Sequence, residues 1–194
     1  MPPTPQMSPR VARTALRPLF RALLSPRWSF ATQRRLLDLA APLQFLPKDT
    51  VVRPIRLAGR PAERITVGAT ERTTAILYLH GGAYTGGSLA THRSLAAHLA
   101  AAAGSAVYVL DYRLAPEHPY PAALNDAEAA YLELVSEHGF EVSGIAIAGD
   151  SAGGGLAAAT THRLVDRHGI TPPALGLLSP WTDPVGPEPD PDEV

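Results

Sequence analysis

The sequence has 194 residues, of which 45% are hydrophobic and 18% are charged, and these proportions are those of one ordinary globular domain. The net charge of −1, together with the lack of zinc-finger, basic-zipper and RNA-binding signatures, excludes nucleic acid as an expected partner. The absence of cysteine excludes disulfides, thiolate metal sites and a cysteine nucleophile. It also agrees with a reducing compartment, so a cytoplasmic location is expected.

Residues 1–48 are expected to form a flexible tail followed by a helical cap. Residues 19–41 have a helical pattern in two pieces, the second beginning at Pro26. No apolar run approaches the roughly 20 residues of a membrane-spanning helix. Seven arginines precede the first acidic residue, Asp38, which indicates a solvated basic face. Contact with an anionic membrane surface is an alternative that Pro18 disfavours, because it interrupts a continuous amphipathic helix.

Residues 49–182 are expected to form the core of an α/β protein. Alternating segments at 51–57 and 62–67 predict two adjacent antiparallel strands. Apolar runs then alternate with amphipathic helical stretches, which predicts a mostly parallel, doubly wound sheet covered on both faces. The later strands are expected at 75–80, 107–112, 145–149 and 175–180, and the helices at 91–103, at 121–138 and from Ser151 to Gly169. The segment 183–194 contains too much proline and acid to pack.

The segment GDSAG at 149–153 matches the pattern G-x-S-x-G. It lies between an expected strand and an expected helix, where a tight turn strains the serine, exposes its hydroxyl and directs the helix N-terminus at developing negative charge. Ser151 is therefore the candidate nucleophile, and Gly149, Asp150 and Gly153 are assigned as residues that support the motif. The alternative is a close-packed glycine turn with an N-capping serine.

The segment HGGAYTGG at 80–87 follows a strand that should lie beside the nucleophile strand. Its consecutive glycines leave backbone N–H groups free to bind a substrate oxyanion. His80 begins this loop and is assigned a supporting role through hydrogen bonds. Neither G-x-x-x-x-G-K-[ST] nor G-x-G-x-x-G is present, so no nucleotide is expected.

The segment DYRLAPEHPYPAAL at 111–124 indicates a rigid proline loop before a helix. Glu117 and His118 are not favoured as a catalytic or metal pair because no third ligand is near, so no metal site is predicted. Together, HGGAY, DYRLAPEHPYPAAL and GDSAGG in this order and spacing resemble the hormone-sensitive-lipase-like branch of the α/β-hydrolase carboxylesterases, over about residues 25–183.

This resemblance implies an α/β-hydrolase fold with an N-terminal helical cap, here about residues 10–48. Ser151 matches the family's nucleophile position. The oxyanion-hole backbone positions match Gly81, Gly82, Ala83 and Ala152. The family usually has a third glycine at the position of Ala83, and alanine is tolerable there if its φ is allowed, because the donor is a backbone N–H. No metal or organic cofactor is implied, since the chemistry needs only a triad and dipoles.

A serine nucleophile needs a base, and the base needs a carboxylate, in the chain order serine, acid, histidine. His162 and His168 follow Ser151 on one expected helix, and His162 would lie about 16 Å along the axis, against roughly 3 Å for proton transfer. His80 is an alternative base, although ordering of its loop is the preferred role. Asp183 is a candidate acid, although a loop carboxylate is preferred because the family's acid comes one strand later.

The chain is therefore expected to resemble the first two-thirds of an esterase, without the acid, the histidine, the last two strands and the second half of the cap. The preferred function is hydrolysis of small apolar carboxylic esters through an acyl-Ser151 intermediate, with turnover strongly reduced by the missing histidine. The alternative is a non-catalytic hydrolase-like fragment that binds acyl ligands or a protein partner. An exposed strand edge at 175–180 predicts self-association.

Overall fold

The computed structural model describes residues 25 and 27–183, and these residues form one six-stranded mixed sheet with the order β1-β2-β4-β3-β5-β6. β2 is antiparallel to both β1 and β4, whereas β4, β3, β5 and β6 are parallel. This arrangement confirms the predicted, mostly parallel sheet with antiparallel first strands. The strands are β1 (Thr50–Leu57), β2 (Arg60–Val67), β3 (Ala75–Leu79), β4 (Ala106–Leu110), β5 (Ile145–Asp150) and β6 (Leu175–Leu178).

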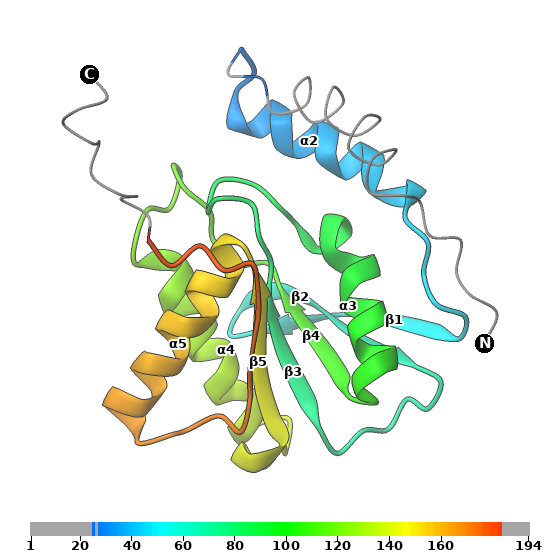
Figure 1. Cartoon of the computed structure of the whole chain (residues 1–194), viewed down its shortest axis with the longest axis vertical. Coiled ribbons are helices and arrows are strands. Elements are labelled where there is room, and N and C mark those ends of the chain that lie inside the picture. Colours follow the sequence, from blue (N-terminus) through cyan, green and yellow to red (C-terminus); the bar gives the residue numbers. More distant parts are fainter. Residues whose placement is uncertain (1–24, 26, 184–194) are drawn as a thin grey trace, which may run out of the picture.

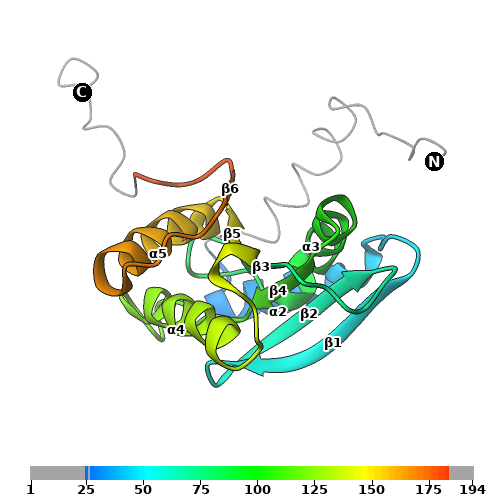
Figure 2. The same cartoon turned by 90° about the horizontal axis from the view of Figure 1, so that it is seen from below.

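Helices cover both faces of the sheet (Figure 2). α3 (Leu89–Ala103) packs on β2 and β4 from one side, and α4 (Ala122–Ser136) and α5 (Ala152–His168) lie together on the other. The 3₁₀ turn η2 (Val142–Gly144) leads into β5. Successive side chains of β3 and β4 therefore enter two separate cores, and both strands are buried along their whole length.

The first two strands form the predicted hairpin, with Leu57 paired to Arg60. Its two-residue turn consists of Ala58 at φ 49° and Gly59 at φ 72°. Two positive φ values give a turn whose twist matches that of the flanking strands. The hairpin joins the parallel strands through β2, whose Ala62–Ile65 segment pairs with β4.

The cap is represented by α2 (Phe30–Ala40) and the 3₁₀ turn η1 (Ala41–Leu43). The prediction that the second cap helix begins at Pro26 is wrong: it begins after Ser29, whose hydroxyl accepts the Thr32 N–H at 3.2 Å and caps the helix. The tail and the first part of the cap, residues 1–24, lie outside the described residues. α2 lies above the edge of the sheet where the parallel strands end (Figure 1).

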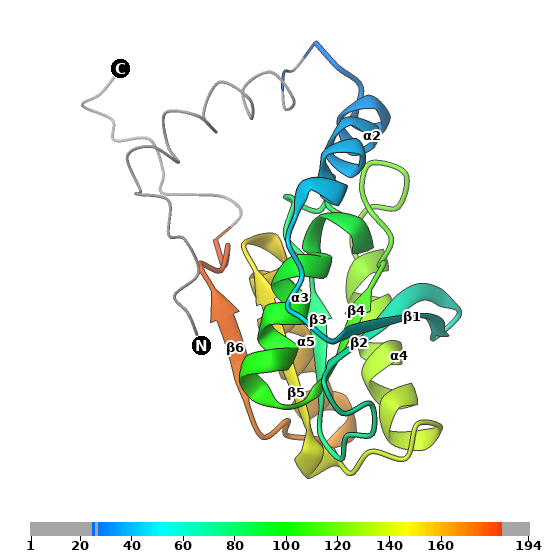
Figure 3. The ribbon, with the colours of Figure 1, turned by 90° about the vertical axis from the view of Figure 1, so that its right-hand side faces the viewer.

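β6 is the outermost strand on the side of the sheet opposite β1 (Figure 3). Leu175, Leu177 and Leu178 are about 40% exposed along it, at 39%, 40% and 41%. The expected terminal segment 183–194 lies outside the described residues except for Asp183. Among the helices that the structure describes, none has the length and apolar character needed to cross a membrane.

Candidate active site

Ser151 occupies a strained turn between the end of β5 and the start of α5. Its φ of 50° and ψ of −121° are unfavourable for a residue with a side chain. The Ser151 N–H donates to Leu178 O at 3.0 Å, and Ser151 O accepts the Trp181 N–H at 2.8 Å. The side chain is exposed and makes no helix-capping hydrogen bond, which contradicts the alternative in which the serine is an N-cap.

Gly149 and Gly153 are required by close packing of backbone on backbone. A Cβ at Gly149 would overlap with the carbonyl group of Gly153, and a Cβ at Gly153 would overlap with the carbonyl oxygens of Leu79 and His80. The first turn of α5 therefore lies directly against the end of β3. This contact brings the loop that follows β3 next to Ser151.

Residues 80–88, here called the oxyanion loop, follow β3, which pairs with β5 through Leu79 and Gly149. The loop folds on itself, because Gly82 O accepts the N–H groups of Thr85 at 3.0 Å and Gly86 at 2.8 Å. Gly82 and Ala83 are exposed, and within the described part of the chain their N–H groups have no hydrogen-bond acceptor. These are the donors that an oxyanion hole needs.

Two predicted oxyanion-hole positions differ from expectation. The Gly81 N–H already donates to Asp150 Oδ1 at 2.9 Å, so the free donors of the loop are those of Gly82 and Ala83, with Ala152 at the first position of α5 as the third candidate. Ala83 has a φ of 54°. Alanine is therefore not in a freely allowed region, and this conformation costs about 1 kcal/mol.

Asp150 connects the turn at Ser151 to two other elements. Its Oδ1 accepts the Tyr78 hydroxyl at 2.7 Å and the Gly81 N–H at 2.9 Å, and its Oδ2 lies 3.5 Å from His92 Nε2 on α3. Burial alone raises the pKa of Asp150, but the hydrogen bonds from His92, Tyr78 and Gly81 outweigh it and lower the pKa below its ordinary value. Asp150 is therefore an anion at neutral pH.

Sequence reasoning did not identify Tyr78 and His92 as parts of this site. A tyrosine inside a fully apolar strand is a usable signal, since a buried hydroxyl usually has a partner. His92 gives no comparable signal, because it is one of several polar residues on an exposed-to-buried helix. Its role depends on how α3 packs beside β3.

His80 is completely buried under the oxyanion loop. Its ring stacks on Tyr112 with centroids 4.4 Å apart and on His92 at 5.2 Å, and Nδ1 lies 2.9 Å from Gly81 O. Burial, followed by the charge of His92, lowers the pKa of His80 to about 4. This environment supports the loop-ordering role and argues against the alternative of a surrogate base at the exposed Ser151 hydroxyl.

The other candidate base and acid positions are separate from the turn. His162 lies on α5 three turns beyond Ser151, and His168 Nε2 lies 2.9 Å from Glu128 Oε1. Asp183 is exposed, and its carbonyl accepts the Trp181 indole N–H at 2.8 Å. Among the described residues, no histidine or carboxylate hydrogen-bonds to the Ser151 hydroxyl.

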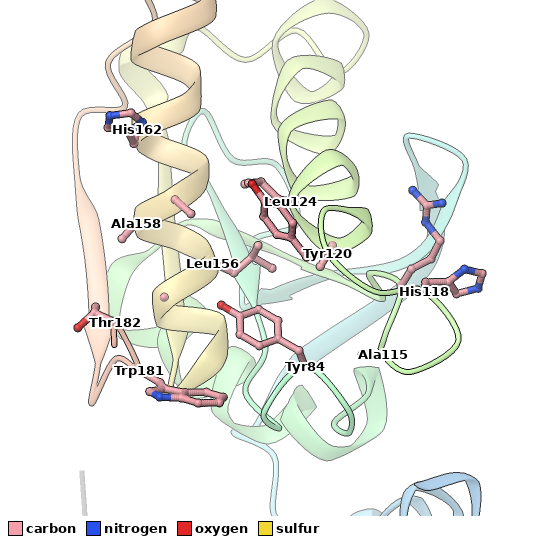
Figure 4. A pocket seen from close by; sticks show the side chains of 14 residues that line it. Tyr84, Ala115, His118, Tyr120, Leu124, Leu156, Ala158, His162, Trp181 and Thr182 are labelled. Atoms are coloured by element: carbon pink, nitrogen blue, oxygen red, sulfur yellow. The ribbon is translucent and has the colours of Figure 1, made fainter. Parts of the chain in front are cut away.

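A largely apolar cavity of about 710 Å³ begins within one helical turn of Ser151 (Figure 4). Tyr84 and Trp181 lie at the end near the serine, Leu124 and Leu156 form the wall between α4 and α5, and His162 lies at the far end of α5. The volume is in the range of small-molecule sites.

The cap contacts the site through the guanidinium of Arg34. Its Nε donates to Thr85 O at 2.8 Å and its Nη2 donates to Ala115 O at 2.7 Å, while both Nη groups bind the Glu117 carboxylate at 3.1 and 2.9 Å. One side chain thus joins α2 to the oxyanion loop and to the 111–121 loop. Glu117 is a partner of Arg34 rather than of His118.

Comparison with known proteins agrees with this geometry. The family described as alpha/beta hydrolase fold matches residues 76–193. The Mycobacterium tuberculosis protein LipR is 42% identical over 167 residues, which are 86% of this chain and 53% of LipR. An esterase from Acinetobacter venetianus is 43% identical over 132 residues, covering 68% of this chain and 43% of that protein.

A solved esterase of the bacterial hormone-sensitive lipase family superimposes with a TM-score of 0.81 at 38% identity, covering 94% of this chain and 60% of that one. The present chain thus spans about half to three-fifths of the length of LipR and of this esterase. The three motifs, the sheet order and the strained serine turn all lie within the matched region. This chain therefore belongs to the α/β-hydrolase-fold family, on the branch of the hormone-sensitive-lipase-like esterases.

Proposed function

We propose that this chain provides the nucleophile and the oxyanion hole of a carboxylic-ester hydrolase. The observation that carries the proposal is the strained, exposed Ser151 beside a loop whose Gly82 and Ala83 N–H groups have no acceptor within the described residues. Such donors act by binding the charge that develops on the carbonyl oxygen of the ester. The esterases to which the chain is similar support the same chemistry.

The proposed reaction has two steps. Ser151 Oγ attacks the ester carbonyl, a base accepts the hydroxyl proton, and the tetrahedral oxyanion is bound by the free N–H groups. The C–O bond to the alcohol then breaks, the alcohol takes a proton, and an acyl-Ser151 ester remains, which water hydrolyses to the carboxylic acid. No base bonds to Ser151 among the described residues, so turnover depends on a base from outside this set.

The substrate class is proposed from the cavity beside the serine. Its walls are mostly apolar and include Tyr84, Leu124, Leu156 and Trp181. An uncharged ester with a small to medium apolar acyl or alcohol group fits such a surface, because burial of its hydrocarbon is favourable and no charged group needs a partner.

A second candidate is a non-catalytic protein that binds acyl ligands in the same cavity. It is favoured by one observation, the lack of a base at the Ser151 hydroxyl in the described chain. The two candidates make opposite predictions for the chemical reactivity of Ser151.

The experiment is labelling by a fluorophosphonate together with p-nitrophenyl butyrate hydrolysis, in wild type, Ser151→Ala and Ser143→Ala. Ser143 is an exposed serine in η2 and serves as the matched control. Labelling and hydrolysis that disappear only in Ser151→Ala support the hydrolase. Equal background rates in all three proteins, with binding of butyrate retained, favour the acyl-binding protein.

Self-association through β6 is also proposed, with a second copy of this chain as the partner. The strand lies at the sheet edge and exposes Leu175, Leu177 and Leu178. Sedimentation velocity should detect a dimer that Leu177→Lys weakens, and a monodisperse wild-type monomer would contradict it. A cytoplasmic location is likewise a proposal, which cell fractionation tests.

A further inference from the structure

We propose that Asp150 is a positioning residue whose carboxylate holds the oxyanion loop in the conformation that presents the Gly82 and Ala83 N–H groups to the substrate. The inference rests on the proposed function and assigns a specific task to the residue before the nucleophile. It is argued from three contacts, one close approach and the strain of the loop.

The contacts place one carboxylate between three elements. Asp150 is the last residue of β5, Tyr78 comes from β3, and His92 comes from α3. The Tyr78 hydroxyl and the Gly81 N–H both donate to Oδ1, at 2.7 and 2.9 Å, and His92 Nε2 lies 3.5 Å from Oδ2. Both oxygens therefore face polar partners, and the side chain has one position in which all of them are satisfied.

The loop backbone lies directly on this carboxylate. A Cβ built at Gly81 would overlap with Asp150 Oδ2 and approach the Asp150 carbonyl oxygen at 2.9 Å. Gly81 is followed immediately by Gly82, the first free donor. Because the Gly81 N–H is fixed by Asp150, the direction of the next two peptide groups is set at its starting point.

The loop needs such a constraint because its backbone is unfavourable. Gly82, Ala83, Tyr84 and Gly87 all have positive φ, at 126°, 54°, 59° and 84°. Two of these residues carry side chains, for which the left-handed region is disfavoured. Without the bond from Asp150, the loop would relax toward conformations in which the two free N–H groups no longer point to one place.

The first experiment measures amide hydrogen exchange by NMR at Gly81, Thr85 and Gly86, the three loop amides with hydrogen bonds in the structure. Exchange in Asp150→Ala should be about 10- to 100-fold faster than in wild type, since a bond to a charged acceptor is lost. In Asp150→Asn it should be only about 3- to 10-fold faster, because the amide oxygen still accepts but carries no charge.

The matched control is Asp126→Ala. Asp126 is also buried and also accepts a loop N–H, that of Arg113 at 2.9 Å, but in the 111–121 loop. It should leave exchange of the three oxyanion-loop amides unchanged. Unchanged exchange in both Asp150 variants, or equal acceleration in Asp126→Ala, overturns the proposal. Should Asp150→Ala fail to fold, wild-type exchange rates in Asp150→Asn overturn it.

The second experiment separates positioning from a merely structural role. For fluorophosphonate modification of Ser151, Asp150→Ala should lower the maximal inactivation rate about 10- to 100-fold while leaving the inhibitor's apparent binding constant nearly unchanged, and Asp150→Asn should restore most of the rate. A change in binding alone overturns the positioning role. A wild-type chain that the reagent does not modify would overturn the proposed function, and the amide exchange would still decide whether Asp150 holds the loop.

Discussion

Replacing His80 by phenylalanine should remove part of the dependence of folding stability on pH. His80 is completely buried between Tyr112 and His92, and its Nε2 has no hydrogen-bond partner among the described residues. Burial and the charge of His92 lower its pKa to about 4. The His80→Phe variant keeps an aromatic ring against Tyr112 and has no titrating group at this position.

The sign and size of the effect follow from proton binding. The unfolded histidine has a pKa of about 6.5, so between about pH 6.5 and 4 the unfolded chain binds a proton that the folded chain does not. Stability from this group is therefore complete above about pH 6.5 and is lost as pH falls toward 4. For pKa values of about 6.5 and 4, roughly 2 kcal/mol of the free energy of unfolding is lost between pH 7.5 and 5.

The assay is urea unfolding of wild type, His80→Phe and the control His98→Asn at pH 7.5 and 5. His98 lies exposed on α3 and controls for removal of any histidine. The loss of stability on acidification should be about 2 kcal/mol smaller in His80→Phe than in the other two proteins. Lost contacts at His80 lower both measurements and cancel in this difference; His80→Asn replaces it if the phenylalanine is not accommodated. An equal pH dependence in all three proteins would refute the buried, neutral histidine.

Three further substitutions test the geometry of the site. Gly153→Ala should lower the free energy of unfolding by about 2 kcal/mol, because its Cβ would overlap with β3 carbonyl oxygens; Gly86→Ala, whose Cβ has only an ordinary contact at 3.6 Å, should change it by less than about 0.5 kcal/mol, and equal values in thermal unfolding would contradict the packing argument. Ala83→Gly should raise stability by up to about 1 kcal/mol as left-handed strain is relieved, and a clear loss would show that the strain is absent. Arg34→Ala should expose α2 to proteolysis more than Glu117→Gln does, since the two carbonyl contacts of the guanidinium survive only in the latter; an exposed ion pair alone contributes at most about 1 kcal/mol.

The layered core was predictable from the sequence because its signals are local. Apolar runs of four to six residues alternate with helical stretches, and Gly104, Gly139 and Gly169 fall where helices or their following turns end, each with positive φ. The strand and helix positions therefore agree with expectation to within a few residues. The start of α2 was not predictable in the same way, because proline and serine both favour a helix start and the choice of Ser29 depends on its side-chain bond to Thr32.

The motifs predicted where the site lies but not how its groups are shared. The use of the Gly81 N–H by Asp150 depends on a distance between two loops that are 69 residues apart. The positive φ of Ala83 was likewise outside the reach of a motif, because most members of the family are expected to have glycine at this position and glycine adopts either sign. Partners such as His92 and Arg34 come from elements whose placement is set by tertiary packing.

The strain at this site is offset by bonds from elements distant in the chain. Ser151, Ala83 and Tyr84 all have positive φ, each at a cost of order 1–3 kcal/mol. The Trp181 N–H binds Ser151 O, and the Ala115 N–H binds Tyr84 O at 2.8 Å. These donors lie after β6 and after β4, so the serine turn and the loop keep their shapes only when the whole sheet is assembled. The geometry required for attack on an ester is therefore a property of the folded core, and a peptide containing the serine motif alone would relax out of it.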